Sequence, residues 1–146
     1  GKEFIKLLEN TNMTKVYKMP VLTAFYNHGD VRMEVTETEL LVSWKEFFST
    51  GTNWKDLDTG ITYEQYCKVS DKDHIKKIIN MPVNFLVKSG KGFFVKKEGS
   101  VLALRDEMKE IIKNPVLAEQ MKDVIEYRVM DYYQRRYKEQ MAAVLQ

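Results

Sequence analysis

The residues of this sequence that could do chemistry are a few carboxylates, one cysteine and two histidines. Asp56, Asp58 and Glu64 lie near one another in the chain and could ligate a divalent ion. Together with the nearby Lys68 they would then provide the residue types that a metal-dependent nuclease site requires. A solvated acidic loop accounts for the same residues more simply. We therefore expect no metal site and no cofactor in this chain.

The histidines and the cysteine do not form a conventional catalytic set. His28 follows Asn27 in a run that resembles a hydrolase loop, but no second histidine or asparagine follows at a useful spacing, so we interpret His28 as a turn residue. Cys67 has no base beside it in the sequence, and we expect it to be a small buried hydrophobic residue. The run Gly90-Lys91-Gly92 does not form a phosphate-binding loop. We predict that the chain is not an enzyme on its own.

The charges are segregated along the chain, although the net charge is only +2. Residues 30–64 carry eight acidic residues against three basic ones, whereas residues 68–97 carry eight lysines against two aspartates. A basic stripe is the electrostatic footprint of a polyanionic partner, and a solvated lysine face is the simpler alternative. The residues that we predict to contact nucleic acid are Lys76, Lys77, Asn84, Lys88, Lys91, Lys96 and Lys97.

The elements that must position these residues follow one another in the order of a winged helix. They are a helix over 18–27, a strand over 31–35, helices over 36–49, 74–79 and 82–89, and two strands over 92–96 and 101–104. Thr36 and Glu39 have the spacing of a capping box, and Trp44 and Phe48 lie on the apolar face of the helix that they begin. Asn80 is positioned to cap the helix that precedes the two-stranded wing.

The helix before the wing is the one that a winged-helix domain lays in a groove of DNA. Its apolar side should be formed by Val83, Leu86 and Val87, leaving Asn84 and Lys88 to face outward. The helix contains no arginine, the usual reader of guanine edges, so we expect little sequence specificity.

The remaining segments complete a single α+β domain that is mostly helical, over residues 1–146. They are a helix over 2–9 with a connector to residue 17, an insertion over 52–73 with a short helix over 63–67, and C-terminal helices over 105–146. The last helix, which follows Asn114, would exceed about 35 Å, so its far end should project or pack on something else.

Aromatic and basic residues alternate on this last helix. They are Tyr127, Arg128, Tyr132, Tyr133, Arg135, Arg136 and Tyr137. They could stack on single-stranded bases. Half-buried amphipathic tyrosines would explain them equally well.

Three runs carry a resemblance to a known family. They are Met13-Thr14-Lys15-Val16-Tyr17-Lys18-Met19-Pro20-Val21-Leu22-Thr23-Ala24-Phe25, Phe93-Phe94 and Asp123-Val124-Ile125-Glu126-Tyr127-Arg128. With them the chain resembles the C-terminal accessory region of large bacterial DEAD/DEAH-box-type helicases, including those similar to the restriction subunit of type III systems. The resemblance implies that the ATP-driven motor lies elsewhere in a larger protein, and that this region positions the duplex or docks on the motor.

We therefore predict a non-catalytic accessory domain that contacts nucleic acid, with DNA favoured, through the wing and the helix before it. The alternative is a protein-docking or structural module without such contact. Nothing in the sequence predicts a membrane segment or a secretory leader, so we expect a cytoplasmic protein.

Overall fold

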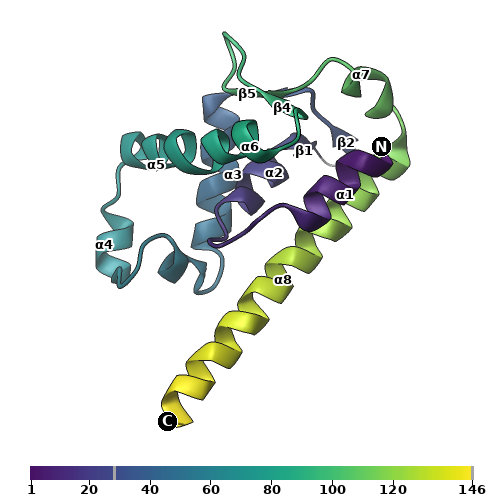
Figure 1. Ribbon diagram of the computed structural model, residues 1–146. Coiled ribbons are helices and arrows are strands. Elements are labelled where there is room, and N and C mark those ends of the chain that lie inside the picture. The colour runs from purple at the N-terminus through teal and green to yellow at the C-terminus, as the bar shows by residue number, and fades with distance from the viewer. Residues whose placement is uncertain (28, 146) are drawn as a thin grey trace.

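The computed structural model describes residues 1–27 and 29–145 and is α+β and mostly helical, as predicted (Figure 1). The helices are α1 (Lys2–Asn10), α2 (Lys18–Phe25), α3 (Glu37–Ser49), α4 (Tyr63–Cys67), α5 (Asp71–Ile78), α6 (Asn84–Ser89), α7 (Met108–Ile111) and α8 (Pro115–Leu145), with a 3-10 turn η1 (Asn53–Asp56) and a π-helical segment η2 (Ile79–Val83). The strands are β1 (Tyr26–Asn27), β2 (Asp30–Val31), β3 (Glu34–Val35), β4 (Phe94–Val95) and β5 (Leu102–Leu104). None of the described helices is both long enough and apolar enough to cross a membrane.

The helix predicted over residues 18–27 is shorter, because its last two residues form a strand. That strand, β1, pairs antiparallel with β2, and Gly29 in the turn between them has φ of 104°, a conformation that favours glycine. The strand predicted over 31–35 is consequently split, with Val31 in β2 and the last two residues in β3. The interpretation of His28 as a turn residue lies outside the described residues.

Helix α3 begins with the predicted capping box. Thr36 Oγ1 accepts a hydrogen bond from the backbone N–H of Glu39 at 3.1 Å, and Glu39 Oε1 accepts one from the backbone N–H of Thr36 at 3.0 Å. The hydrogen bond from the backbone N–H of Thr36 favours the charged carboxylate and is the main reason why the pKa of Glu39 is lowered. The helix buries Trp44 and Phe48 completely, which confirms the prediction for its apolar face.

The helices predicted over 74–79 and 82–89 form one continuous helical run. The run begins at Asp71, because Ser70 Oγ accepts a hydrogen bond from the backbone N–H of Asp73 and so caps it. Asn80 does not cap a new helix but lies inside η2, where the wider turn accommodates Pro82, which has no N–H to donate. The predicted break at Asn80 is therefore wrong, and the last residues of the predicted insertion over 52–73 belong to α5.

A three-stranded antiparallel sheet in the order β3-β5-β4 pairs the strand that precedes α3 with the hairpin that follows α6. Its central strand β5 is buried at every residue, and β4 packs against α6. Phe94 of β4 and Leu86 of α6 lie in the same apolar core as Trp44 and Phe48 of α3. The β4–β5 hairpin therefore lies beside the helix that precedes it, and both share one core with α3.

The long helix α8 covers α1 and α2 with its first half, and its C-terminal half projects from the domain (Figure 1). Its 31 residues span about 46 Å. Leu117, Met121, Ile125 and Tyr132 are buried, whereas none of the described residues after Tyr132 is. The predicted projection of the far end is confirmed, while the helix predicted to begin at residue 105 is confined to α7.

Two buried or half-buried cations hold the connector between α1 and α2 in place. Arg128 of α8 donates hydrogen bonds to the carbonyl oxygens of Leu8, at 3.1 Å, and Thr11, at 2.6 Å. Lys18 donates to Thr11 Oγ1 at 3.0 Å and to the carbonyl oxygen of Asn12 at 2.6 Å. The carbonyl groups at the end of α1 and in the connector therefore receive the hydrogen bonds that a helix end cannot supply itself.

A buried histidine joins α5 to α3. His74 is 3% exposed, and its Nδ1 accepts a hydrogen bond from Trp44 Nε1 at 3.1 Å. Nδ1 must be unprotonated to accept this bond. Burial lowers the pKa of His74, Lys45 and Lys77 lower it further, and Asp71 and Asp73 oppose the shift.

We expect the domain to lose stability as the pH falls below about 6.5, the ordinary pKa of histidine. The folded-state pKa of His74 lies below the unfolded value. The corresponding stability is therefore fully present above the unfolded pKa and is lost as the pH falls through the folded pKa. Denaturant titrations at pH 7.5, 6.5 and 5.5 measure this slope. In His74→Gln, which keeps an acceptor for Trp44, the slope over this range should flatten, and an unchanged slope would contradict the assignment to His74.

Candidate nucleic-acid interface

The candidate interface begins on α6 and the last residue of η2, which bear out the predicted apolar side but only part of the predicted outward side. Val83 and Leu86 are buried, Val87 is half-buried, and Lys88 is exposed. Asn84, predicted to face outward, is half-buried. Only part of the surface of α6 is therefore accessible to a nucleic acid. Lys88 is the charged residue that α6 contributes to the candidate interface.

The turn from α6 to β4 is unusually tight. A Cβ atom on Gly90 would collide with the carbonyl oxygen of Leu86, so glycine is required there. Lys91 and Gly92 follow with φ of 52° and 80°. Among the described residues Lys91 is the only non-glycine residue with positive φ, a conformation that costs an ordinary residue free energy.

The predicted lysines differ in how free their charges are. Lys76, Lys88, Lys91 and Lys96 are exposed and form no ion pair with any described residue. Lys97 is exposed but pairs with Glu34 of β3. Lys88, Lys91 and Lys96 thus follow one another from the end of α6, through the turn, to the end of β4, with their charges free.

Some lysines of the basic run 68–97 form ion pairs with carboxylates of the acidic run 30–64 and are therefore not free to bind nucleic acid. Lys77 pairs with Asp58, and its ammonium group lies 5.4 Å from the centre of the Tyr17 ring. Lys68 pairs with Glu64 at 3.1 Å. The segregation of charge along the sequence is therefore partly cancelled in space, and Lys77 has a structural role that the sequence did not reveal.

Two residues that the sequence did not single out lie on the same elements. Phe85 of α6 is 47% exposed. Arg105, directly after β5, stacks its guanidinium group 4.0 Å from the centre of the Phe93 ring, and its Nε is buried without a hydrogen-bond partner in the described chain. Neither is marked by a motif, because an exposed apolar residue and a stacked arginine depend on tertiary packing.

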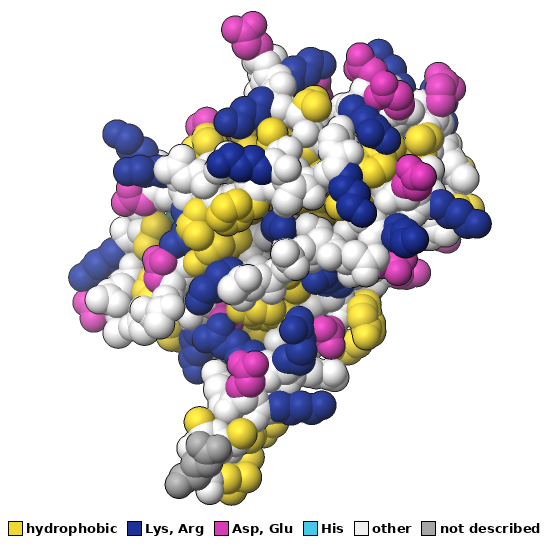
Figure 2. Space-filling view, in the orientation of Figure 1, with side chains coloured by type: hydrophobic (Ala, Val, Ile, Leu, Met, Phe, Trp, Pro, Cys, Tyr) yellow, Lys and Arg dark blue, Asp and Glu magenta, His cyan; other side chains and the backbone are white. Residues whose placement is uncertain are grey.

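Figure 2 shows the face of the molecule that carries α5, α6 and the β4–β5 hairpin. Lysine and arginine side chains are spread over this face, and hydrophobic side chains lie between them. Acidic side chains are present at its margins, including the tip of the hairpin. The free cations thus share the surface with apolar groups.

The residues considered for catalysis are not brought together. Asp56, predicted in a solvated loop, is buried and pairs with Arg136 of α8, while Asp58 pairs with Lys77. Cys67, predicted to be buried, is exposed because it lies at the end of the short surface helix α4. Within residues 1–27 and 29–145, no group of three or more histidine, cysteine, aspartate or glutamate side chains could hold a metal ion.

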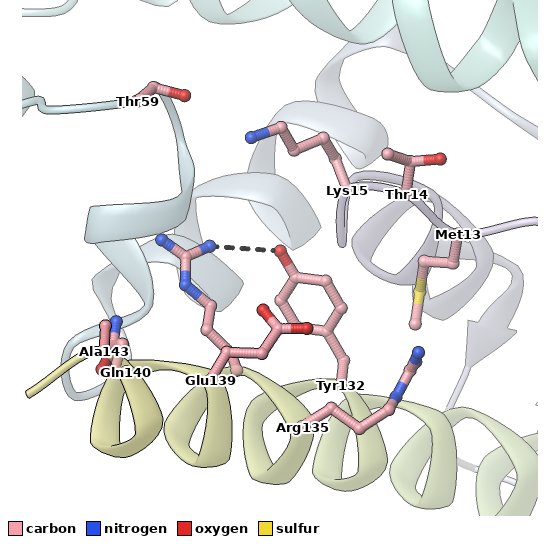
Figure 3. A pocket seen from close by; sticks show the side chains of 10 residues that line it. Met13, Thr14, Lys15, Thr59, Tyr132, Arg135, Glu139, Gln140 and Ala143 are labelled. Carbon is pink, nitrogen blue, oxygen red and sulfur yellow. Dashed lines mark hydrogen bonds between the residues drawn. The ribbon is translucent and has the colours of Figure 1, made fainter. Parts of the chain in front are cut away.

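An open groove of about 580 Å³ lies between α8 and the connector (Figure 3). Tyr132 and Glu139 rise from α8 toward Met13, Thr14 and Lys15 of the connector. Tyr132 accepts a hydrogen bond from Arg136 at 3.3 Å and donates one to Asp56 at 3.4 Å. The groove has mixed charge, and its central groups are used to attach α8 to the domain.

The tyrosines of α8 divide into two sets. Tyr132 is buried and Tyr133 is half-buried, which agrees with the packing explanation for these two residues. Arg128 and Arg136 are occupied by internal contacts. Tyr127 and Tyr137 are 62% and 63% exposed.

Comparisons with protein-family models, curated proteins and solved structures find no match to this chain.

Proposed function

We propose that this chain is a winged-helix-type accessory domain that binds nucleic-acid phosphates through α6, the turn after it and the β4–β5 hairpin. The element order supports the fold: β3 precedes α3, and the helical run α5–α6 leads directly into the hairpin. The strand order β3-β5-β4 is the pairing expected when the strand before α3 joins the second strand of a wing.

The observation that carries the proposal is the set of free cations Lys88, Lys91 and Lys96. They occupy the surface that a winged helix presents to a duplex, and none is neutralised by a described acidic residue. Lys91 has a left-handed backbone conformation that glycine would adopt at a lower free-energy cost, and yet a lysine is present there. Backbone strain of this kind is often found where a side chain has a function.

Phosphate contact without base reading is the mode of binding that these groups favour. Lysines attract phosphates irrespective of sequence. The α6 helix has no arginine, and the guanidinium group of Arg105 is stacked on Phe93. We therefore propose weak, sequence-tolerant binding to DNA. By its resemblance to helicase accessory regions, the domain would hold the duplex for an ATP-driven motor elsewhere in a larger cytoplasmic protein.

Binding to a labelled duplex should be weak and steeply dependent on salt. If the three free lysines each contact a phosphate, the log–log salt slope should be roughly −3. Changing Lys88, Lys91 and Lys96 together to glutamate should remove most of this slope and most of the binding at low salt. Fluorescence anisotropy at several salt concentrations measures both quantities.

A matched control has the same charge change elsewhere. Lys2, Lys6 and Lys109 are exposed and form no ion pair with a described residue. Their joint replacement by glutamate should leave most of the binding intact. Lys91→Gly should weaken binding without lowering the stability of the domain. If the wild-type chain gives no signal at low ionic strength, or both triple variants lose binding equally, the proposal is wrong.

Protein docking is the second candidate function, and the predicted insertion provides the observation that favours it. Trp54 packs edge-to-face against Tyr63, with 5.3 Å between the ring centres, and Tyr63 is 59% exposed. Under this alternative, the isolated domain would not bind DNA even at low salt. Changing Trp54 or Tyr63 would instead weaken its association with the motor domains.

A further inference from the structure

Helix α8 has a second apolar face, which no part of the described chain covers. Its first face, with Leu117, Met121, Ile125 and Tyr132, is buried against the domain. The second face, which we call the α8 seam, is apolar apart from Gln134 and is formed by Tyr127, Met130, Gln134, Tyr137, Met141 and Val144. All six residues are exposed, Met130 by 54% and Val144 by 79%.

The spacing of the α8 seam is that of a coiled-coil interface. Its residues alternate in steps of three and four, so Tyr127, Gln134 and Met141 occupy a positions of a heptad and the other three occupy d positions. Ile125 and Tyr132, which pack on the domain, then fall at f positions on the opposite side of the helix. The seam therefore faces away from the body of the molecule.

The C-terminal half of the seam lies where α8 leaves the domain (Figure 1). An open groove of about 520 Å³ follows it there, lined by Met130, Tyr133, Gln134, Tyr137 and Lys138. These residues occupy a, d, e and g positions of the same heptad, which are the positions that a second helix contacts. A second helix packed along the seam would contact the residues that line this groove.

We propose that the α8 seam binds the α8 seam of a second copy of this chain in antiparallel orientation. In an antiparallel pair each a residue lies opposite a d residue. The seam then forms layers of Tyr127 with Val144, Met130 with Met141, and Gln134 with Tyr137, each layer occurring twice. The first layer joins an aromatic ring to an aliphatic group, the second joins two flexible thioethers, and the third joins two polar side chains.

The charges beside the seam favour this orientation. In the antiparallel pair, Asp131 and Lys138, both at e positions, lie opposite each other, so two complementary contacts form. A parallel pair would instead place Glu126, at a g position, opposite Asp131, a repulsive contact on each side. Asp131 is 42% exposed in its side chain and pairs only with Arg135 of its own helix, at 3.1 Å, so it remains accessible to Lys138 of a second copy.

The position of the globular part of each chain is compatible with this pairing. Because each seam faces away from its own domain, the domains would lie on the outer sides of the two-helix layer. The seam runs over about 26 Å, which is short for a coiled coil. We therefore expect a reversible dimer that forms as the concentration rises, not a permanent one.

Sedimentation equilibrium of the full 146-residue chain over a range of concentrations tests the proposal. The wild-type chain should show a monomer–dimer equilibrium. Met141→Glu introduces a charge into two layers of the dimer and should raise the dissociation constant at least about tenfold. Ala142→Glu, at the adjacent exposed position outside the seam, should change it little. A wild-type chain that stays monomeric, or a dimer that tolerates Met141→Glu, would overturn the proposal.

The orientation is tested by exchanging charges. Asp131→Lys and Lys138→Asp should each weaken the dimer, because each places like charges opposite one another in the antiparallel pair. The double exchange should restore it. In a parallel dimer, Asp131→Lys would instead strengthen association, by placing a lysine opposite Glu126. That result, or a double exchange without recovery, would rule out the antiparallel pair.

Discussion

Replacing Trp44 with alanine is expected to lower the free energy of unfolding by about 4 kcal/mol. Trp44 is fully buried, and its ring centre lies 4.7 Å from that of Phe48 and 5.6 Å from that of Tyr17. The substitution would leave a large cavity among these rings, and it would deprive His74 of the hydrogen bond from Trp44 Nε1. Denaturant unfolding followed by circular dichroism measures the change.

Two control variants separate the contributions of the ring and the hydrogen bond. Trp44→Phe retains an aromatic ring but leaves His74 Nδ1 without a donor, and we expect it to cost about 2 kcal/mol. Val42→Ala, on the same helix at a position that is 53% exposed, should cost less than about 1 kcal/mol. If Trp44→Ala were no more costly than Val42→Ala, Trp44 would not be a close-packed part of the core.

Several features that local sequence signals determine were predicted correctly. The capping box of Thr36 and Glu39 needs only residues three positions apart, and it fixed the start of α3. The buried side of α3 followed from helical spacing, and the length of α8 from the absence of a breaking residue after Pro115. Such signals act within a few turns of helix, so no knowledge of tertiary contacts is needed.

The interruption around Pro82 shows where local signals are ambiguous. A proline near an asparagine is typical of a helix start, and the sequence therefore predicted a new helix there. A π-helical segment can also accommodate a proline inside a helix, and here Pro82 and Val83 are both buried. Packing of these residues favours the continuous helix, and packing is not visible in the local sequence.

The candidate interface was predicted only in part, because pairing between charges is a property of the fold. Lys88, Lys91 and Lys96 remain free, but Lys77 and Lys97 find Asp58 and Glu34 in distant parts of the chain. A count of charges along the sequence cannot distinguish these two groups. The exposure of Phe85 likewise depends on how α6 is packed.

Asp56 is the clearest case of a residue whose environment was hidden from the sequence. It lies in an irregular stretch that also carries Asp58 and Glu64, which predicts a solvent-exposed acidic loop, yet it is only 6% exposed. The explanation is Arg136, which reaches it from the far half of α8. Tyr132 adds a hydrogen bond at 3.4 Å. The pair therefore attaches α8 to the η1 turn where the helix begins to leave the domain.

Arg136→Met is accordingly expected to lower the free energy of unfolding by about 3 kcal/mol. Methionine keeps the apolar stem of arginine, but Asp56 would remain buried with Tyr132 as its only hydrogen-bond donor in the described chain. Removing one partner of a buried ion pair typically costs about 3–5 kcal/mol. We expect a cost near the lower end of this range because the Arg136 side chain is 34% exposed. Denaturant unfolding measures the loss, and limited proteolysis of α8 beyond Tyr132 should become faster.

The cost should come from the uncompensated carboxylate and not from the missing arginine alone. The double variant Asp56→Asn with Arg136→Met removes both charges, so it should recover a large part of the stability that Arg136→Met loses. Arg135→Met, at the neighbouring position, breaks only an exposed pair with Asp131 and should cost less than about 1 kcal/mol. If Arg136→Met and Arg135→Met were equally mild, Asp56 would have to be solvated in the folded state, and the attachment of α8 through this pair would be disproved.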